Sequence, residues 1–159
     1  MKEKIFTLLL FLFLSSCGYE ATYSLKNRAI YAFSISELQL AGDRQINIKT
    51  KQMFNVYSNT IKLNQGIEKI FALKISSNSE KIITTKDSSG DATKFNNKIT
   101  LSVEALMNGE YKSNFVITEN FTYDNNSNTF ELKNYEKQIK NNLTETAVSK
   151  IISKLSNIK

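Results

Sequence analysis

The 159-residue chain contains no histidine, proline or tryptophan, and it has only one cysteine and five glycines. Without histidine, Ser-His-Asp and Cys-His catalytic centres cannot form, and the commonest general base and metal ligand is missing. One cysteine is too few for a disulfide framework or a cysteine-based zinc site. Glycine is too sparse for collagen-like or low-complexity sequence. The composition therefore disfavours an enzyme and gives no indication of a metal site.

Arginine is also scarce, although the chain is basic. There are 21 Lys and Arg against 15 Asp and Glu, but only Arg28 and Arg44 supply the bidentate group favoured for phosphates and base edges. The basic residues are scattered singly, so we expect no nucleic acid partner. The net charge of +6 indicates either an acidic partner or only solubility. An apolar fraction of 41% at this length suits one folded domain and excludes a disordered chain.

The N-terminus has the pattern of a secretory signal followed by a lipid attachment site. Met1-Lys2-Glu3-Lys4 precedes an almost wholly apolar run, Ile5–Leu14. As a helix this run spans roughly 15 Å, about half of a bilayer core, so it does not predict a spanning segment. The sequence Leu14-Ser15-Ser16-Cys17 resembles the bacterial lipobox. That resemblance implies diacylglycerol on the Cys17 thiol, cleavage before Cys17 and acylation of the freed amine.

The alternative is a plain signal peptide with a cysteine there by chance. An unpaired cysteine is unusual in an exported protein, however, and its place at the end of the apolar run favours the lipobox. Two or three acyl chains anchor a soluble domain durably. Gly18 stands where an Asp would imply retention at the inner membrane, so the resemblance implies the outer one. We predict a signal peptide at 1–16, a lipidated tether at 17–34 and one domain at 35–159.

Within the domain, the hydrophobic period first predicts a strand, a helix and two further strands. Residues 35–40 form a short, imperfectly alternating strand, and Asp43 is a plausible N-cap. The helix is indicated by a stripe at spacings of three and four: Ile46, Thr50, Met53, Phe54, Tyr57 and Ile61. Residues 71–85 and 98–105 alternate as strands, and the turn signal between them lies at 86–91.

The remaining chain predicts a hairpin partner and a long helix. Beyond the turn signal Asn108-Gly109, one parity of the next strand is aromatic or apolar: Tyr111, Phe115, Ile117, Phe121 and Tyr123. From about residue 131 to 156 the period is helical, with one stripe and its flanks: Leu132, Tyr135, Ile139, Leu143, Ala147, Val148, Ile151, Ile152 and Leu155.

The register of this hairpin depends on its loop. A two-residue loop at Asn108-Gly109 would place Val103 opposite Asn114, which puts the two apolar rows on different faces. A three-residue loop (108–110), or a bulge, places Val103 opposite Phe115 and buries both rows together. We expect the second register and prefer the longer loop or a bulge.

These elements predict an α+β fold. In the order β-α-β-β-β-α, two helices with one apolar stripe each need a surface to cover, and a roughly four-stranded sheet with one apolar face provides it. The result is a two-layer sandwich. The other face of the sheet, rich in Lys, Thr, Ser and Asn, is expected to meet water or a polar partner.

The order and spacing of these features resemble the lipopolysaccharide-assembly lipoproteins (LptE). The resemblance runs from the lipobox and Cys17-Gly18-Tyr19, through 35–61 and Leu101-Ser102-Val103-Glu104-Ala105, to the amphipathic helix at 131–156. Many family members carry a proline a few residues after the cysteine, whereas Glu20-Ala21-Thr22 has none.

The resemblance implies an outer-membrane lipoprotein on the periplasmic side that plugs the β-barrel translocon LptD. It implies help in assembling that barrel and in delivering lipopolysaccharide to the cell surface. The implied partners are LptD, lipopolysaccharide and the membrane that holds the acyl chains. No reaction and no cofactor are implied, in agreement with the missing histidine.

In the family, glycolipid contact is attributed to basic residues around the tip of the middle hairpin. The corresponding stretch here does not reproduce the family's arginine, because Gly90 or Asp91 falls near its position. Lys86, Lys94 and Lys98 are the nearest cations that could meet lipid A phosphates, as point charges rather than bidentate forks. The alternative is that they are ordinary surface lysines flanking a turn.

A second function stays open from the sequence. The chain could be a stand-alone periplasmic or surface lipoprotein that binds a ligand or scaffolds the envelope with the same sandwich. That alternative predicts a monomer without a barrel partner and a concave pocket for a ligand.

Overall fold

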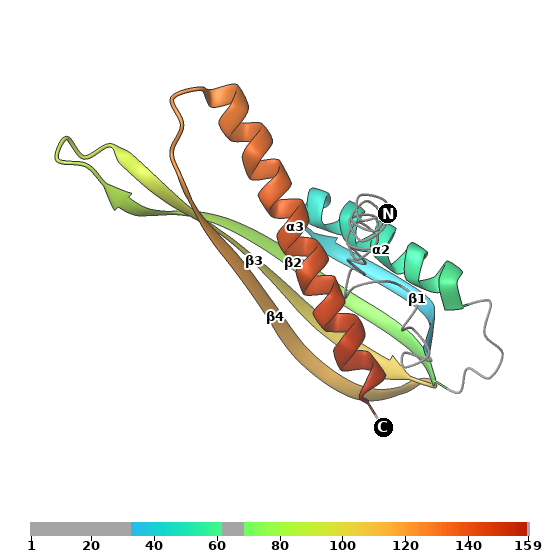
Figure 1. Ribbon diagram of the computed structural model, residues 1–159. Helices are drawn as coiled ribbons and strands as arrows, with labels where there is room; N and C mark the ends of the chain where they lie inside the picture. Colours follow the sequence, from blue (N-terminus) through green and yellow to red (C-terminus); the bar gives the residue numbers. More distant parts are fainter. Residues whose placement is uncertain (1–32, 62–68, 159) are drawn as a thin grey trace, which may run out of the picture.

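The computed structural model describes residues 33–61 and 69–158. The elements are β1 (Phe33–Gly42), α2 (Arg44–Ile61), β2 (Lys69–Lys86), β3 (Ala92–Met107), β4 (Glu110–Asp124) and α3 (Thr129–Ser156). The sheet order is β1-β2-β3-β4, with β1 parallel to β2 and the other neighbours antiparallel. Both helices lie on one face of the twisted sheet (Figure 1). The predicted α+β fold and its element order are therefore confirmed.

The predicted signal peptide and Cys17 lie outside the described residues. So does the tether, apart from its last two residues. The first strand begins at Phe33, two residues before the expected start at Ile35. Phe33 is fully buried against the main core. The folded domain therefore includes the end of the segment expected to be a tether.

A bulge in β1 accounts for its imperfect alternation. The pairing with β2 shifts between Ile35 and Glu37, which makes Ser36 an extra residue in the strand. Ile35 before the shift and Leu38 after it both pack against the main core. The bulge thus keeps the apolar side chains of β1 on one face of the sheet, although the sequence does not alternate strictly.

The hairpin between β3 and β4 has a two-residue turn. Met107 pairs with Glu110, and the two residues between them, Asn108 and Gly109, have φ angles of 53° and 85°. Positive φ at both positions is what the tight hairpin turn requires, and it explains the Asn-Gly sequence. The three-residue loop that we preferred is therefore wrong.

The expected register is nevertheless present, because a bulge follows the turn. The pairing of β4 with β3 shifts beyond Ala105, with Lys112 as the extra residue. After the shift Val103 lies opposite Phe115, as predicted. Before it, Tyr111 is turned to the opposite face and is 61% exposed. The expectation that Tyr111 shares a face with Phe115 is wrong for this reason.

The predicted stripe of α2 faces the sheet. Its buried members are Ile46, Thr50, Phe54 and Tyr57, whereas the side chain of Ile61 lies outside the described part. The largest buried side chains of the main core come from both layers: Phe33, Phe54, Phe71, Ile75, Leu101 and Ile151. Burial of this apolar surface is the main source of the fold's stability.

The buried stripe of α3 winds around the helix. Residues spaced by four, such as Ile139, Leu143, Ala147 and Ile151, rotate by about 40° per step, because four residues exceed one turn. The N-terminal part of the stripe packs in a separate small cluster with Tyr123, and the C-terminal part packs in the main core. One long helix therefore serves two apolar clusters. Neither helix in the described part of the chain is long and apolar enough to span a membrane.

Candidate functional site at the outer hairpin

The end of the β2–β3 hairpin projects beyond β1. The last residue pair between β1 and β2 is Gly42 with Ser77, and Ser77 pairs with Leu101 of β3. Residues 78–100 therefore form an outer hairpin that β1 does not border (Figure 1). Residues 80–91 are all exposed. The outer hairpin contains all three lysines proposed to contact glycolipid.

The turn at the tip is organised by a single carboxylate. The Asp87 side chain accepts hydrogen bonds from the backbone N–H groups of Ser89 and Asp91, both at 2.9 Å. Gly90 has φ +90°, a conformation that favours glycine. Asp87 and Asp91 also place two negative charges beside Lys86. The tip is therefore not a purely basic surface.

The structure places Lys94 and Lys98 on one face of the sheet. The core residue Ile99 has the opposite parity, so these two lysines lie on the face that the helices leave uncovered. The register shifts between Lys94 and Ala92, the partner of Lys86, so Lys86 is not aligned with the other two. Lys94 and Lys98 are four residues apart, about 13 Å along a strand. The three lysines therefore do not converge on one point.

Two of the three lysines already have acidic neighbours. Lys94 Nζ is 3.1 Å from Asp124 Oδ1, and Lys98 Nζ is 4.0 Å from Glu80 Oε2. Both pairs are exposed, so they are weak and can exchange with another anion. Lys86 has no ion pair among the described residues. The three lysines can therefore contact phosphates only as separate point charges.

A polar contact that the sequence did not predict fastens the outer hairpin to α3. Lys81 Nζ is 2.6 Å from Glu136 Oε1 and 3.8 Å from the centroid of the Phe95 ring. The Tyr123 hydroxyl donates to the same Glu136 oxygen at 2.8 Å. Burial, and then the hydrogen bond and negative charge of Glu136, raise the pKa of Tyr123. The carboxylate thus joins β2, β4 and α3.

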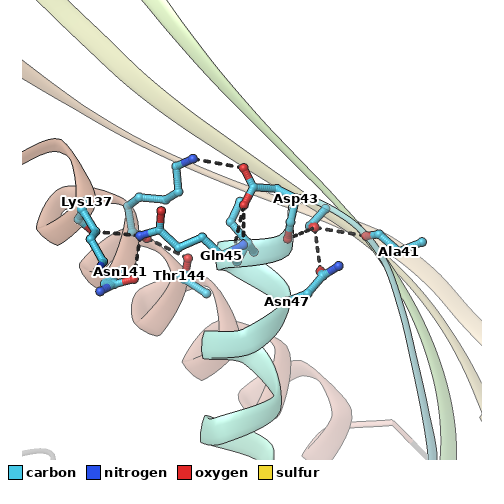
Figure 2. Close-up of polar contacts among 10 residues, drawn as sticks. Ala41, Asp43, Gln45, Asn47, Lys137, Asn141 and Thr144 are labelled. Atoms are coloured by element: carbon cyan, nitrogen blue, oxygen red, sulfur yellow. Dashed lines mark hydrogen bonds and ion pairs between the residues drawn. The ribbon is translucent and has the colours of Figure 1, made fainter. Parts of the chain in front are cut away.

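A second group of polar contacts joins β1, β2 and both helices (Figure 2). Asp43 caps α2, as predicted, by accepting from the N–H groups of Gln45 and Ile46 at 2.9 and 3.1 Å. Its other oxygen is 3.0 Å from Lys140 Nζ. Burial acts to raise the pKa of Asp43, but the hydrogen bonds and the Lys140 charge outweigh it and lower the pKa.

The neighbours of Asp43 extend this contact on both sides. The Gln45 amide donates to Lys137 O and Asn141 Oδ1 of α3 at 3.2 and 3.0 Å. The Ser77 hydroxyl on β2 lies 2.7 Å from Asn47 Oδ1. All groups have partners within the protein, so the arrangement is structural rather than an open binding site.

A hollow of about 800 Å³ lies where β4 ends and α3 begins. It is open to solvent, and its aromatic and apolar lining residues are Phe121, Tyr123, Leu132 and Tyr135. Sequence reasoning did not predict it, because it is formed by two elements joined through a polar loop. Within residues 33–61 and 69–158, no three Asp, Glu, Cys or His side chains are grouped closely enough to hold a metal ion.

Solved structures with the same fold are bacterial lipoproteins. Rare lipoprotein B of Shewanella oneidensis is 10% identical with a TM-score of 0.56, over 78% of this chain and 97% of that one. A minor lipoprotein of Acinetobacter baumannii is 11% identical with a TM-score of 0.57, over 79% and 91%. Lipoprotein B of Nitrosomonas europaea is 14% identical with a TM-score of 0.51, over 81% and 88%.

No family model and no curated protein sequence matches this chain. At identities of 10–14%, the likeness to the solved structures shows a shared fold. That fold spans nearly the whole of each neighbour.

Proposed function

We propose that the chain is an outer-membrane lipoprotein, anchored through Cys17 on the periplasmic side, that plugs the LptD barrel. In this role it helps the barrel to assemble and assists delivery of lipopolysaccharide to the cell surface. It catalyses no reaction and uses no cofactor. The observation that supports the proposal is a lipobox-like sequence in front of a domain whose fold recurs, over most of its length, in bacterial lipoproteins.

The glycolipid contact belongs to the outer hairpin. Lys86 lies beside its tip, and Lys94 and Lys98 lie on its uncovered face, away from the helices. Their exposed ion pairs are weak enough for phosphates to compete with the acidic partners. Because the three cations are spread along the hairpin, they suit several phosphates of a packed glycolipid better than a single anion.

The central experiment is isolation of the acylated protein from membranes of its own bacterium. A tag added after Lys159 leaves Cys17 and the outer hairpin untouched. We expect a β-barrel of the LptD type to co-purify, and mass spectrometry of the mature N-terminus to show an acylated Cys17. Depletion of the protein should reduce surface lipopolysaccharide. An unacylated N-terminus, or an unchanged outer membrane after deletion, would contradict the proposal.

The lysine contact is tested separately. A Lys94→Ala and Lys98→Ala double variant should bind purified lipopolysaccharide more weakly than the wild type while retaining the barrel. The matched control is a Lys74→Ala and Lys112→Ala double variant, which removes the same charge from the sheet away from the outer hairpin. Equal losses in both variants would show a nonspecific charge effect and reject the lysine contact.

The stand-alone lipoprotein is retained as a second candidate because of the hollow between β4 and α3. Its size is within the range of small-molecule sites, and aromatic side chains line part of it. The hollow is open to solvent, however. In the described part of the chain, one buried side-chain polar atom has no hydrogen bond. This atom is Thr50 Oγ1, which belongs to α2 and does not line the hollow. A ligand that co-purifies with a monomer lacking any barrel would favour this second function.

A further inference from the structure

Charge is divided unevenly between the helices and the rest of the described chain. α2 and α3 carry eight Lys and Arg against three Glu, a net charge of +5. The remaining described residues carry seven Lys against nine Asp and Glu, a net charge of −2. The helical layer is therefore the positive side of the molecule.

Half of the helical cations have partners within the described residues. Three form ion pairs with carboxylates, and one lies over the Phe115 ring. The other four are exposed and have no ion pair or side-chain hydrogen bond with described residues: Arg44, Lys51, Lys133 and Lys137. Arg44 stands in the first turn of α2, where the helix dipole disfavours a positive charge and α2 has no acidic residue. Helix stability therefore does not explain its charge.

Exposed apolar side chains lie among these cations. Ile48, 50% exposed, is four residues after Arg44 and three before Lys51, so the three share one stripe of α2. Phe130 is 73% exposed, and Lys133 and Lys137 follow it at the same helical spacing.

The two stripes approach each other at one end. The amide of Gln45, the residue after Arg44, donates to Lys137 O at 3.2 Å. The first turn of α2 therefore lies beside α3 at Lys137. We call the six residues the basic-apolar face: Arg44, Ile48, Lys51, Phe130, Lys133 and Lys137.

We propose that the basic-apolar face rests on an anionic lipid surface. Unpaired cations attract anionic headgroups, and an exposed phenyl ring enters the boundary between headgroups and acyl chains. An acidic protein would also match the charge, but a lipid boundary supplies both anionic groups and an apolar layer for Phe130. The inference concerns the helical side of the domain when no barrel encloses it, so it depends neither on LptD being the partner nor on acylation of Cys17.

The absence of tryptophan from the chain makes a position-specific test possible. A Phe130→Trp variant of the full chain carries a single tryptophan at the proposed contact. A Tyr111→Trp variant carries one on β4, at a site that is also exposed but belongs to the sheet. Each is mixed with phosphatidylcholine vesicles, with and without phosphatidylglycerol, and tested for quenching by brominated lipid. Quenching reports depth at that residue, so attachment elsewhere in the chain does not mimic it.

We expect a blue shift and quenching of the Phe130→Trp variant in vesicles containing phosphatidylglycerol, and neither for Tyr111→Trp. Adding Lys133→Ala and Lys137→Ala should weaken the lipid titration on the order of tenfold. Adding Lys74→Ala and Lys112→Ala instead, which removes the same charge from the sheet, should leave it unchanged. Equal quenching at the two tryptophan positions, no quenching at Phe130→Trp, or no effect of the helical lysines would overturn the proposal.

Discussion

At the scale of single residues, the contact of β1 with β2 depends on a position without a side chain. Gly42 has φ +97°, and a Cβ built there would lie 1.9 Å from Ser77 O. Asp43 follows directly and begins the cap of α2. The backbones of β1 and β2 therefore approach each other closely at the last residue of β1, and a methyl group cannot be accommodated there without moving one of the two strands.

Replacing Gly42 with Ala should destabilise the fold by at least about 2 kcal/mol, since backbone strain and a backbone clash add together. The control is Gly90→Ala, which shares the positive φ but has open space around the added methyl group. Its cost should be about 1 kcal/mol. Urea unfolding of both variants measures the difference, and equal losses would show that the close approach to Ser77 is unimportant.

Asp43 makes the free energy of unfolding depend on pH in the acidic range. Its folded pKa is lowered, so between that value and the ordinary 3.8 the unfolded chain binds more protons. The stabilising contribution is therefore complete above the ordinary value and is lost as pH falls through the folded one. In urea titrations over a series of acidic pH values, Asp43→Asn should show a shallower loss than the wild type. Parallel curves would contradict this assignment.

At the scale of elements, the bulges at Ser36 and Lys112 correct a mismatch between sequence and sheet. The helices and strands were predictable because their periods are long and local. The β4 register was predictable because it must bury two apolar rows together. The bulge at Lys112 appeared only as an alternative, and the bulge at Ser36 was not predicted, because each depends on the facing strand. For the Asn108-Gly109 turn we preferred a three-residue loop, whereas the structure has a two-residue turn.

The long helix α3 begins at a cap whose contribution can be measured. Asn128 Oδ1 accepts hydrogen bonds from the N–H groups of Phe130 and Glu131 at 3.1 and 3.3 Å. Asn128→Ala should lower the free energy of unfolding by about 1 kcal/mol, and Asn128→Ser should lower it little, because serine is also a good cap. Similar losses in both variants would argue against capping.

At the scale of the whole molecule, the contacts that hold the layers together join residues far apart in the sequence. Lys81 and Glu136 are separated by 55 positions, and Lys140 and Asp43 by 97. No local pattern in the chain marks these partners, so sequence reasoning did not find them. The lysines of the candidate site were placed on the correct hairpin, but the common face of Lys94 and Lys98 and their acidic neighbours required the structure.

Glu136 should control the docking of the outer hairpin on α3. In Glu136→Ala the buried Tyr123 hydroxyl and Lys81 lose their shared acceptor, at a cost of about 1–2 kcal/mol. Amide hydrogen exchange should then accelerate in residues 78–100 and remain unchanged in β1. The Glu136→Gln control keeps an acceptor for Tyr123 and should have a smaller effect. Uniform acceleration across the sheet would mean that the hairpin has no independent docking.

The difference in length between β1 and β2 has a further consequence. Past Ser77, β2 has a hydrogen-bonding neighbour only on the β3 side among the described residues, so a row of amide and carbonyl groups is bare. Such an unpaired strand edge can pair with strands of other molecules and promote aggregation. Here two register shifts near Thr85 interrupt the free edge of β2, and Glu80 and Lys81 place opposite charges along it. These features disfavour pairing of a second molecule's strand with this edge.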